Sequence, residues 1–277
     1  MKLIKDKLFV LVFMILGGML AFAETLPPEY QAPPRTEQER RDEKKNLVVK
    51  EVNTDAKGKR QWMDHLTVWN EYGYKIEEIE YAVYGQKERV TFEYDENWKC
   101  IREDVYNDKN KRYRIRKFEY NEDGRKKIQY NYNPDGKLFS TKIFEYSYSS
   151  DSPSAQLKNP PRNDQERREI RKNLVIKEIN TDAKGKRQWM DHLTVWNEQG
   201  YKIEDIEYAV YGQKERTTYE YDENWVCVRE NVYNDKNKLY RIRKFDYNTE
   251  GKKKVQYNYN PDGKLYSTKV YDYSFKD

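Results

Sequence analysis

Four side chains of this 277-residue sequence could carry imidazole or thiol chemistry, namely two histidines and two cysteines. His65 and His192 occur in the same nonapeptide, QWMDHLTVW, and each follows an aspartate, Asp64 or Asp191. Neighbouring side chains on a β-strand point to opposite faces, so this Asp–His pair is not expected to form a catalytic dyad. We interpret each histidine as a partly exposed, hydrogen-bonded structural residue.

The two cysteines, Cys100 and Cys227, stand 127 residues apart. The N-terminal segment predicts that the chain is exported. Unpaired thiols are unusual in exported proteins, so the state of these two needs an explanation. We predict two buried thiols that pack as small apolar side chains. A Cys100–Cys227 bridge and an intermolecular disulfide are the alternatives.

Known catalytic and metal-binding patterns are absent from the sequence, which has no HExxH, GxSxG, glycine-rich phosphate loop or paired-cysteine motif. The turns rich in Asp and Asn also lack the full spacing of a calcium loop. We therefore predict no catalytic residue, no metal and no cofactor. The many carboxylates leave one enzymatic alternative, a glycan-active hydrolase that uses a carboxylate pair.

Two groups of side chains could bind a ligand without catalysis. Tryptophans among rows of tyrosine present flat apolar faces that suit stacking on sugar rings, and arginines at alternate strand positions share a face that could contact anions. The candidates are Trp62, Trp69, Trp98, Arg112, Arg114 and Arg116, with Trp189, Trp196, Trp225, Arg241 and Arg243. The competing structural roles are cross-strand aromatic ladders in place of an aliphatic core and a solvated charged face balanced by Glu77, Glu78 and Glu80.

These candidates belong to a tandem duplication. Residues 33–148 align without a gap to residues 160–275, with 25 differences in 116 positions. Several differences exchange similar apolar side chains, such as Val49 and Ile176, as packed positions do when volume is kept. Residues 149–159, SSDSPSAQLKN, are predicted to be a linker.

Each copy is predicted to begin with a short charged helix and to continue as β-strands. Thr36 and Glu39 form a capping-box pattern, as Asn163 and Glu166 do in the second copy. Segments of about eight residues rich in Tyr, Phe, Val and Thr then alternate with Asx-containing hairpin turns. A period of 26 residues, marked by Phe-Glu-Tyr, holds two strands and two turns. We predict an all-β fold with seven or eight antiparallel strands per copy, and the low aliphatic content favours an open, solenoid-like sheet over a barrel or a sandwich.

The turn pattern of aromatic, Asp or Asn, two residues, Gly and Lys or Arg occurs in YNEDGRK from Tyr120 and in YNPDGKL from Tyr132 and Tyr259. It resembles the YD-type repeats of Rhs proteins and, in style, MORN-like hairpin repeats of bacterial surface or secreted proteins. The resemblance implies an extended antiparallel scaffold associated with carbohydrate binding or protein interaction. Trp98 and Trp225 stand where this pattern has Gly, and the 26-residue period is longer than a typical YD repeat.

The N-terminus has the organisation of a signal peptide, with three lysines before an apolar run and Ala21-Phe22-Ala23 at its end. We predict a leader at 1–23, a Pro-rich tail at 24–32, β-repeat copies at 33–148 and 160–277, and no stable membrane span after leader cleavage. The protein is therefore expected to be periplasmic, on the cell surface or extracellular, which argues against a nucleic-acid partner.

Composition limits the function as well as the fold. Charged residues make up 36% of the chain and aromatic residues 15%, with a formal net charge of +5. Because disordered chains contain few aromatics, most of the chain is expected to fold. We predict a non-catalytic exported module that binds polysaccharide or an envelope protein. The alternative is a purely structural protein without a small ligand, and edge strands could also pair between chains.

Overall fold

The computed structural model describes residues 36–148, 163–210 and 212–276. The predicted leader, Pro-rich tail and linker lie outside these ranges. Within them, no helix is both long and apolar enough to cross a membrane.

Each copy forms one short helix followed by eight strands, as the sequence pattern predicts. The first copy contains α2 (Glu37–Asp42), β1 (Leu47–Asp55), β2 (Gln61–Trp69), β3 (Lys75–Ala82), β4 (Gly85–Tyr94), β5 (Cys100–Tyr106), β6 (Arg112–Tyr120), β7 (Lys126–Tyr132) and β8 (Leu138–Tyr148). The second contains α3 (Asp164–Glu169), β9 (Leu174–Asp182), β10 (Gln188–Trp196), β11 (Lys202–Ala209), β12 (Gly212–Tyr221), β13 (Cys227–Tyr233), β14 (Leu239–Tyr247), β15 (Lys253–Tyr259) and β16 (Leu265–Phe275).

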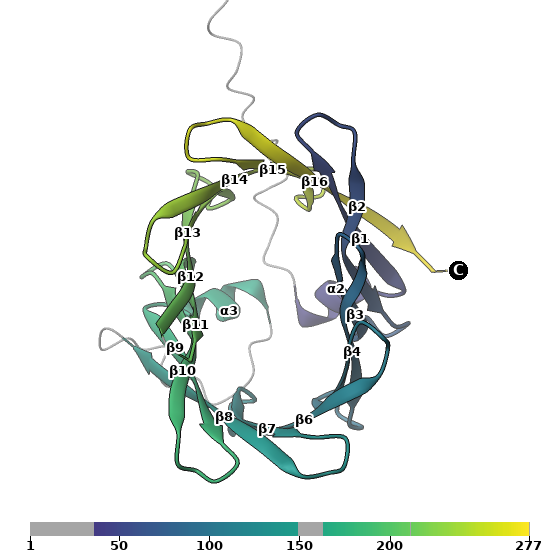
Figure 1. The fold of residues 1–277 in the computed structure, drawn as a ribbon, viewed down its shortest axis with the longest axis vertical. Coiled ribbons are helices and arrows are strands. Elements are labelled where there is room, and N and C mark those ends of the chain that lie inside the picture. The colour runs from purple at the N-terminus through teal and green to yellow at the C-terminus, as the bar shows by residue number, and fades with distance from the viewer. Residues whose placement is uncertain (1–35, 149–162, 211, 277) are drawn as a thin grey trace, which may run out of the picture. The chain divides into compact units, whose positions relative to one another are not determined.

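The sixteen strands form one closed antiparallel barrel, so the prediction of an open, solenoid-like sheet is wrong. Sequential strands pair throughout, and the ring is completed where β8 pairs with β9 and β16 pairs with β1 (Figure 1). We call these two junctions between the copies the seams. Because both ends of each meander are paired at the seams, the edge strands expected to support self-association are used within the chain.

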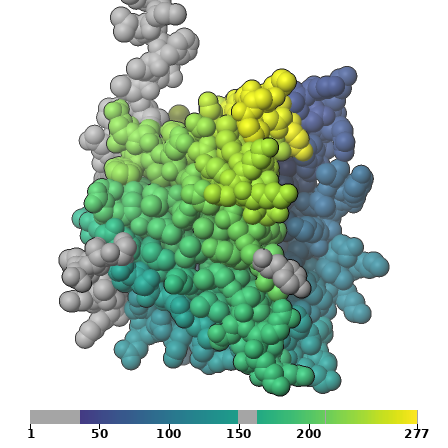
Figure 2. Space-filling model, turned by 60° about the vertical axis from the view of Figure 1, so that its left-hand side comes forward, coloured from purple at the N-terminus to yellow at the C-terminus, as the bar shows by residue number. Residues whose placement is uncertain are grey.

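A shortage of aliphatic residues does not oppose this closure, because the inner wall is built from other side chains. A ring of sixteen strands is too wide for side chains to fill it as they fill an eight-stranded barrel. Along β6, exposure alternates strictly from Lys117 to Tyr120, with Lys117 and Glu119 exposed and Phe118 and Tyr120 shielded. Because side chains crowd together on the concave face of a closed sheet, we assign the shielded positions of the strands to the inner wall. Figure 2 shows the opposite, outer surface over strands of the second copy.

Tyrosines stabilise the inner wall by bonding to neighbouring backbone. The Tyr94 hydroxyl donates to the Lys75 carbonyl at 2.7 Å, and the Tyr120 hydroxyl donates to the Cys100 carbonyl at 2.5 Å. The same bond recurs at Tyr146, Tyr221, Tyr247 and Tyr273. These six residues, which we call the tyrosine ladder, are the last residues of the Phe-Glu-Tyr repeats and their counterparts.

The hairpin connections lie on two rims. Connections after even-numbered strands, at 70–74, 95–99 and 121–125 and their copies, form one rim, and those after odd-numbered strands form the other. Many of them are Asx turns, as predicted; in one, the Asn70 side-chain oxygen accepts from the backbone of Tyr72 and Tyr74.

Both helices belong to the rim that carries turn 70–74, which we call the helix rim. A Cβ at Gly73 would lie 2.1 Å from the Arg41 carbonyl oxygen, and one at Gly200 would lie 2.2 Å from that of Arg168. Only glycine therefore allows the helices to approach these turns so closely. In Figure 1, α2 and α3 project within the ring of strands.

The two helices also meet each other. Arg40 contacts Asp164 at 2.5 Å, and Arg167 forms a two-pronged pair with Glu37. These contacts are equivalent under the 127-residue offset, so each copy makes the same contact to the other. The predicted capping box of Thr36 and Glu39 is confirmed, and at Asn163 the N-cap bond from the Glu166 backbone is present.

Candidate functional site

Lysines bridge carboxylates of the other copy at both seams. On the inner wall, Lys269 of β16 contacts Glu51 at 2.9 Å and Asp64 at 2.5 Å. Although burial disfavours the cation, these carboxylates raise the pKa of Lys269 above its usual value. The equivalent Lys142 contacts Glu178 at 2.7 Å and Asp191 at 2.6 Å. Each seam is thus held by ion pairs as well as by strand pairing.

Each histidine lies beside its seam network and pairs with an acid on the next strand. His65 Nε2 lies 2.8 Å from Glu78, whose other oxygen lies 2.5 Å from Lys75. The hydrogen bond to Glu78 raises the pKa of His65, and the same bond, with help from Lys75, lowers the pKa of Glu78 to about 2. The histidines are half-buried and hydrogen-bonded, as predicted.

A bulge changes the expected relation between Asp64 and His65. Met63 and His65 face Val52 and Glu51, which leaves Asp64 as an extra residue in its strand. Asp64 accepts from Asn53 on the inner wall, while His65 bonds Glu78 on the same wall. The expectation that the two side chains point to opposite faces was wrong, but they still use different partners.

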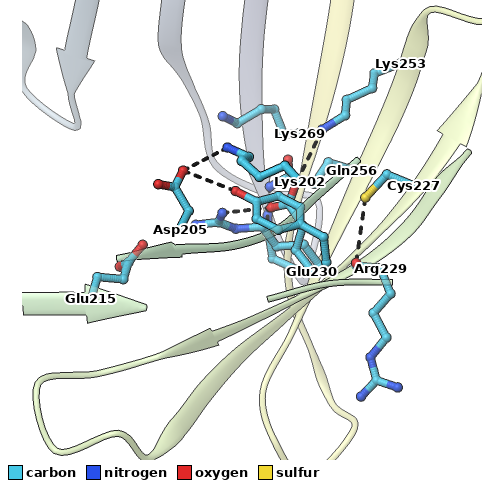
Figure 3. A network of polar contacts seen from close by, with 12 residues as sticks. Lys202, Asp205, Glu215, Cys227, Arg229, Glu230, Lys253, Gln256 and Lys269 are labelled. Atoms are coloured by element: carbon cyan, nitrogen blue, oxygen red, sulfur yellow. Dashed lines mark hydrogen bonds and ion pairs between the residues drawn. The ribbon is translucent and has the colours of Figure 1, made fainter. Parts of the chain in front are cut away.

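The second copy repeats the histidine cluster with a shorter acid. His192 and Lys202 both bond Asp205, the latter at 2.8 Å. Burial opposes ionisation of Asp205, yet its bonds to His192 and Lys202 hold its pKa at about 2. Figure 3 shows Lys202 reaching Asp205 close to the next group of charges.

That next group surrounds a shielded glutamate. Glu103, with a side chain 10% exposed, contacts Arg116 at 3.0 Å and Lys126 at 3.6 Å. Its counterpart Glu230 is contacted by Arg243 at 3.0 Å and by Lys253 at 3.6 Å (Figure 3). Two of the predicted ligand-binding arginines, Arg116 and Arg243, are therefore neutralised within the wall.

The arginines of β6 do not form the shared stripe that their alternation predicts. Arg112 contacts Asp104, whereas Arg116 contacts Glu103, and these acids are neighbours on opposite faces of β5. A register shift at Tyr106 places Arg112 out of phase. In the second copy, Leu239 and Asn231 replace Arg112 and Asp104, so both partners of this ion pair are lost together.

Arg114 and Arg241 pack at the rim opposite the helices. Arg114 donates to the Asn133 side chain at 2.7 Å and lies 3.7 Å above the Phe139 ring. Arg241 makes the same contacts to Asn260, at 2.8 Å, and to Tyr266, at 3.7 Å. Both guanidinium groups are thus held by an amide and a ring.

Trp98 and Trp225 each centre an aromatic cluster on the helix rim. Trp98 stacks on Tyr74 with ring centroids 4.5 Å apart and an interplanar angle of 8°, and Tyr72 lies 4.7 Å away. Trp225 stacks on Tyr201 at 4.6 Å and 9°. Trp98 is 37% exposed and Trp225 is 39% exposed. The clusters are Tyr72, Tyr74, Tyr94 and Trp98, and Tyr201, Tyr221 and Trp225.

The other four tryptophans are half-buried at the two ends of their strands. Trp62 faces Asn53 near the start of β2, and Trp69 faces Lys75 at its end. Trp189 and Trp196 hold the same positions in β10. The predicted tryptophans are therefore divided between the two rims rather than gathered in one row.

The cysteines are free and half-buried, on β5 and β13. Burial raises the pKa of Cys100 and of Cys227 to about 11, which keeps both thiols protonated and unreactive. Of the alternatives, the Cys100–Cys227 bridge is not formed within the chain, and the intermolecular disulfide stays a prediction. Across the described ranges, no group of three or more His, Cys, Asp or Glu residues is placed to hold a metal.

Sequence reasoning missed the seam lysines, because their partners are far away along the chain; Lys269 and Glu51 are 218 residues apart. The tyrosine ladder carried a readable signal, since its members end the Phe-Glu-Tyr motif at 26-residue intervals. The signal for the Trp98 cluster was the tryptophan in a position where other turns have Gly.

Comparisons with known proteins give no family and only distant structural neighbours. No family model and no curated protein matches the chain. Among solved structures, a porin-like protein from Bacteroides uniformis is 8% identical, with 83% of this chain and 97% of that chain covered and a TM-score of 0.39. A porin-like protein from Bacteroides vulgatus is 10% identical, with 81% and 97% covered and a TM-score of 0.32. A DUF1329 family protein from Desulfovibrio piger is 8% identical, with 84% and 86% covered and a TM-score of 0.25. Similarity at this level supports no functional inference.

Proposed function

We propose that the protein is an exported, non-catalytic binding protein whose two aromatic clusters on the helix rim recognise sugar rings. Export rests on the predicted leader at residues 1–23. The observation that carries the binding proposal is the backbone conformation of Trp98 and Trp225, which have φ values of 58° and 60°.

This conformation is costly for a bulky residue. The left-handed region is suited to glycine, and the corresponding turn positions hold Gly73 at φ 78° and Gly124 at φ 81°. Holding a tryptophan there costs of order 1–3 kcal/mol and is typical of functional sites. The strained turn keeps the indole at the helix rim, stacked on Tyr74 and partly open to solvent.

The surroundings of Trp98 suit a carbohydrate. Sugar rings stack on indole faces through their C–H groups, and their hydroxyls bond to carboxylates. Glu96 of the same turn supplies such a carboxylate, as Glu223 does beside Trp225. Asp95 and Asp222 shape these turns by accepting from backbone N–H groups. Because the cluster occurs twice in one barrel, a repetitive glycan could engage both sites, which raises avidity without new contacts.

The charges of the inner wall favour binding over catalysis. A catalytic general acid needs a raised pKa, whereas the pKa values of Glu78 and Asp205 are lowered to about 2 by their cationic partners. The carboxylates therefore remain ionised within ion pairs, which argues against a hydrolytic carboxylate pair at these positions.

Replacing Trp98 and Trp225 by Gly tests the proposal on a polysaccharide array. Glycine fits the positive φ of both turns, so the fold should survive, with an unchanged circular dichroism spectrum, while glycan binding is lost. The matched control is Asn110→Gly with Asn237→Gly, two positions with φ of 56° and 54° on the opposite rim. If the tryptophan variant still binds, the clusters are not the site. If the unaltered protein binds no glycan, a structural role replaces the proposal.

A further inference from the structure

The connection between β3 and β4 has an apolar tip that turn geometry does not require. Two residues, Val83 and Tyr84, join Ala82 to its partner Gly85. Two-residue hairpins usually carry Asn, Asp or Gly. Here Tyr84 is 99% exposed and Val83 is 46% exposed. Adjacent exposed apolar side chains that the turn does not require are candidates for contact with a partner or a membrane.

Val210 of the second copy holds the position of Val83, on the same rim. Val210, 45% exposed, follows β11 just as Val83 follows β3. Both connections follow odd-numbered strands of a closed antiparallel barrel, so they emerge from the rim opposite the helices. Two apolar tips related by the repeat therefore point away from the same side of the molecule.

This rim is strongly basic, and we call it the basic rim. Its connections, residues 56–60, 83–84, 107–111 and 133–137 and their copies, contain twelve Lys or Arg and four Asp, a net charge of +8. Counting Asp55 and Asp182, which end the adjoining strands, still leaves +6. The helix-rim connections, 70–74, 95–99 and 121–125 and their copies, carry −6. The near-neutral chain is thus polarised along the barrel.

We infer that the basic rim docks on a lipid bilayer with anionic headgroups, with the Val83–Tyr84 and Val210 tips entering the interface. Basic residues accumulate a protein at an anionic membrane surface, and apolar and tyrosine side chains then bury in the headgroup region. A soluble polyanion would also neutralise the lysines, but it would leave the apolar tips in water. The two tips would hold the barrel upright, with the helix rim and its aromatic clusters facing away from the membrane.

Vesicle co-sedimentation of the full chain tests this inference. Binding should be strong to vesicles of phosphatidylcholine with phosphatidylglycerol, weak to phosphatidylcholine alone, and reduced by added salt. The tip variant Val83→Ser, Tyr84→Ser, Val210→Ser should bind the anionic vesicles at least about fivefold more weakly. Lys57→Gln, Lys59→Gln, Lys184→Gln and Lys186→Gln together should weaken binding and flatten its salt dependence.

A matched control removes exposed apolar side chains from the other end of the barrel. Ile203→Ser, Val228→Ser and Phe275→Ser alter residues 38%, 39% and 60% exposed at strand ends of the helix rim. This variant should bind vesicles like the unaltered chain. Equal losses of vesicle binding in the control and in the tip variant would overturn the inference. It would also be overturned if the tip variant bound fully and only the lysine variant lost binding, because that result would indicate a polyanion as the partner. Glycan-array binding is read separately, so either proposal can fail alone.

Discussion

The side-chain amine of Lys269 lies 2.5 Å from a carboxylate oxygen of Asp64 and so connects the last strand of the second copy to the second strand of the first. The Lys269 side chain is only 17% exposed. Its counterpart Lys142 reaches Asp191 at 2.6 Å with the same exposure.

Replacing Lys269 by Met should lower the free energy of unfolding by about 3 kcal/mol, because Glu51 and Asp64 would lose their shared cation in a shielded site. Urea denaturation measures the loss, and Lys142→Met should give a similar value. Adding Glu51→Gln and Asp64→Asn to Lys269→Met should restore much of the stability. If the triple variant is no more stable than Lys269→Met alone, the loss of stability does not have an electrostatic origin.

Stability should fall as the pH rises past the ordinary histidine pKa of 6.5. The pKa values of His65 and His192 are raised above the ordinary 6.5 by their bonds to Glu78 and Asp205. Their contribution to the free energy of unfolding is therefore complete well below pH 6.5 and is lost as the pH rises through the folded-state pKa. Thermal melts at a series of pH values should show a melting temperature that falls as the pH rises. This dependence should disappear in the double variant His65→Gln, His192→Gln.

At the acidic end the sign reverses. Since the pKa of Glu78 is lowered from 4.5 to about 2, its contribution is present above pH 4.5 and is lost as the pH falls toward 2. Glu78→Gln should therefore destabilise the protein at pH 6 by about 1 kcal/mol, after allowance for solvent screening, and much less near pH 2. An equal destabilisation at both pH values would exclude the ion pair as the cause.

Gly73→Ala should detach or distort α2, because the new Cβ would overlap the Arg41 carbonyl oxygen. The expected cost is about 2–4 kcal/mol. Gly58→Ala is the matched comparison, since Gly58 has a similar φ of 69° but no atom within 4 Å of the added Cβ; it should cost only about 1 kcal/mol. The difference between the two unfolding free energies isolates the helix contact, and identical costs would show that the contact contributes nothing.

The tyrosine ladder should contribute through its hydroxyls as well as its rings. Tyr94→Phe removes the bond to the Lys75 carbonyl and leaves that acceptor shielded, for an expected loss of about 1 kcal/mol. Tyr130→Phe provides the comparison, because the Tyr130 hydroxyl bonds Glu119 on the exposed face. Chemical denaturation should find the Tyr130 variant nearly as stable as the unaltered protein, and a loss equal to that of Tyr94→Phe would refute a special role for the ladder.

Local pattern was enough to predict the strands and turns. The spacing of Tyr94, Tyr120 and Tyr146 placed three strands, and Thr36 and Asn163 marked the two helix starts. These features depend on interactions within a few residues or between adjacent strands, so the sequence displays them directly. The resemblance to YD-type repeats stays a prediction.

The closure of the barrel and the arrangement of the candidate site could not be predicted from local sequence pattern. Closure depends on whether β8 matches β9 and β16 matches β1, a property of edges that no single segment displays. The inward position of Asp64 depends on one bulge in β2. Arg112 and Arg116 lie on different faces of the sheet because of a register shift between β5 and β6. Aliphatic content misled the fold prediction because a wide barrel can be lined by tyrosines and ion pairs.

The two seams are equivalent, so the last strand of each copy matches the first strand of the other. A single copy therefore carries both of the edges that a twofold homodimer would need to close the same ring. In one chain the two halves are permanently paired and can differ from each other, as Asp104 with Arg112 and Asn231 with Leu239 do.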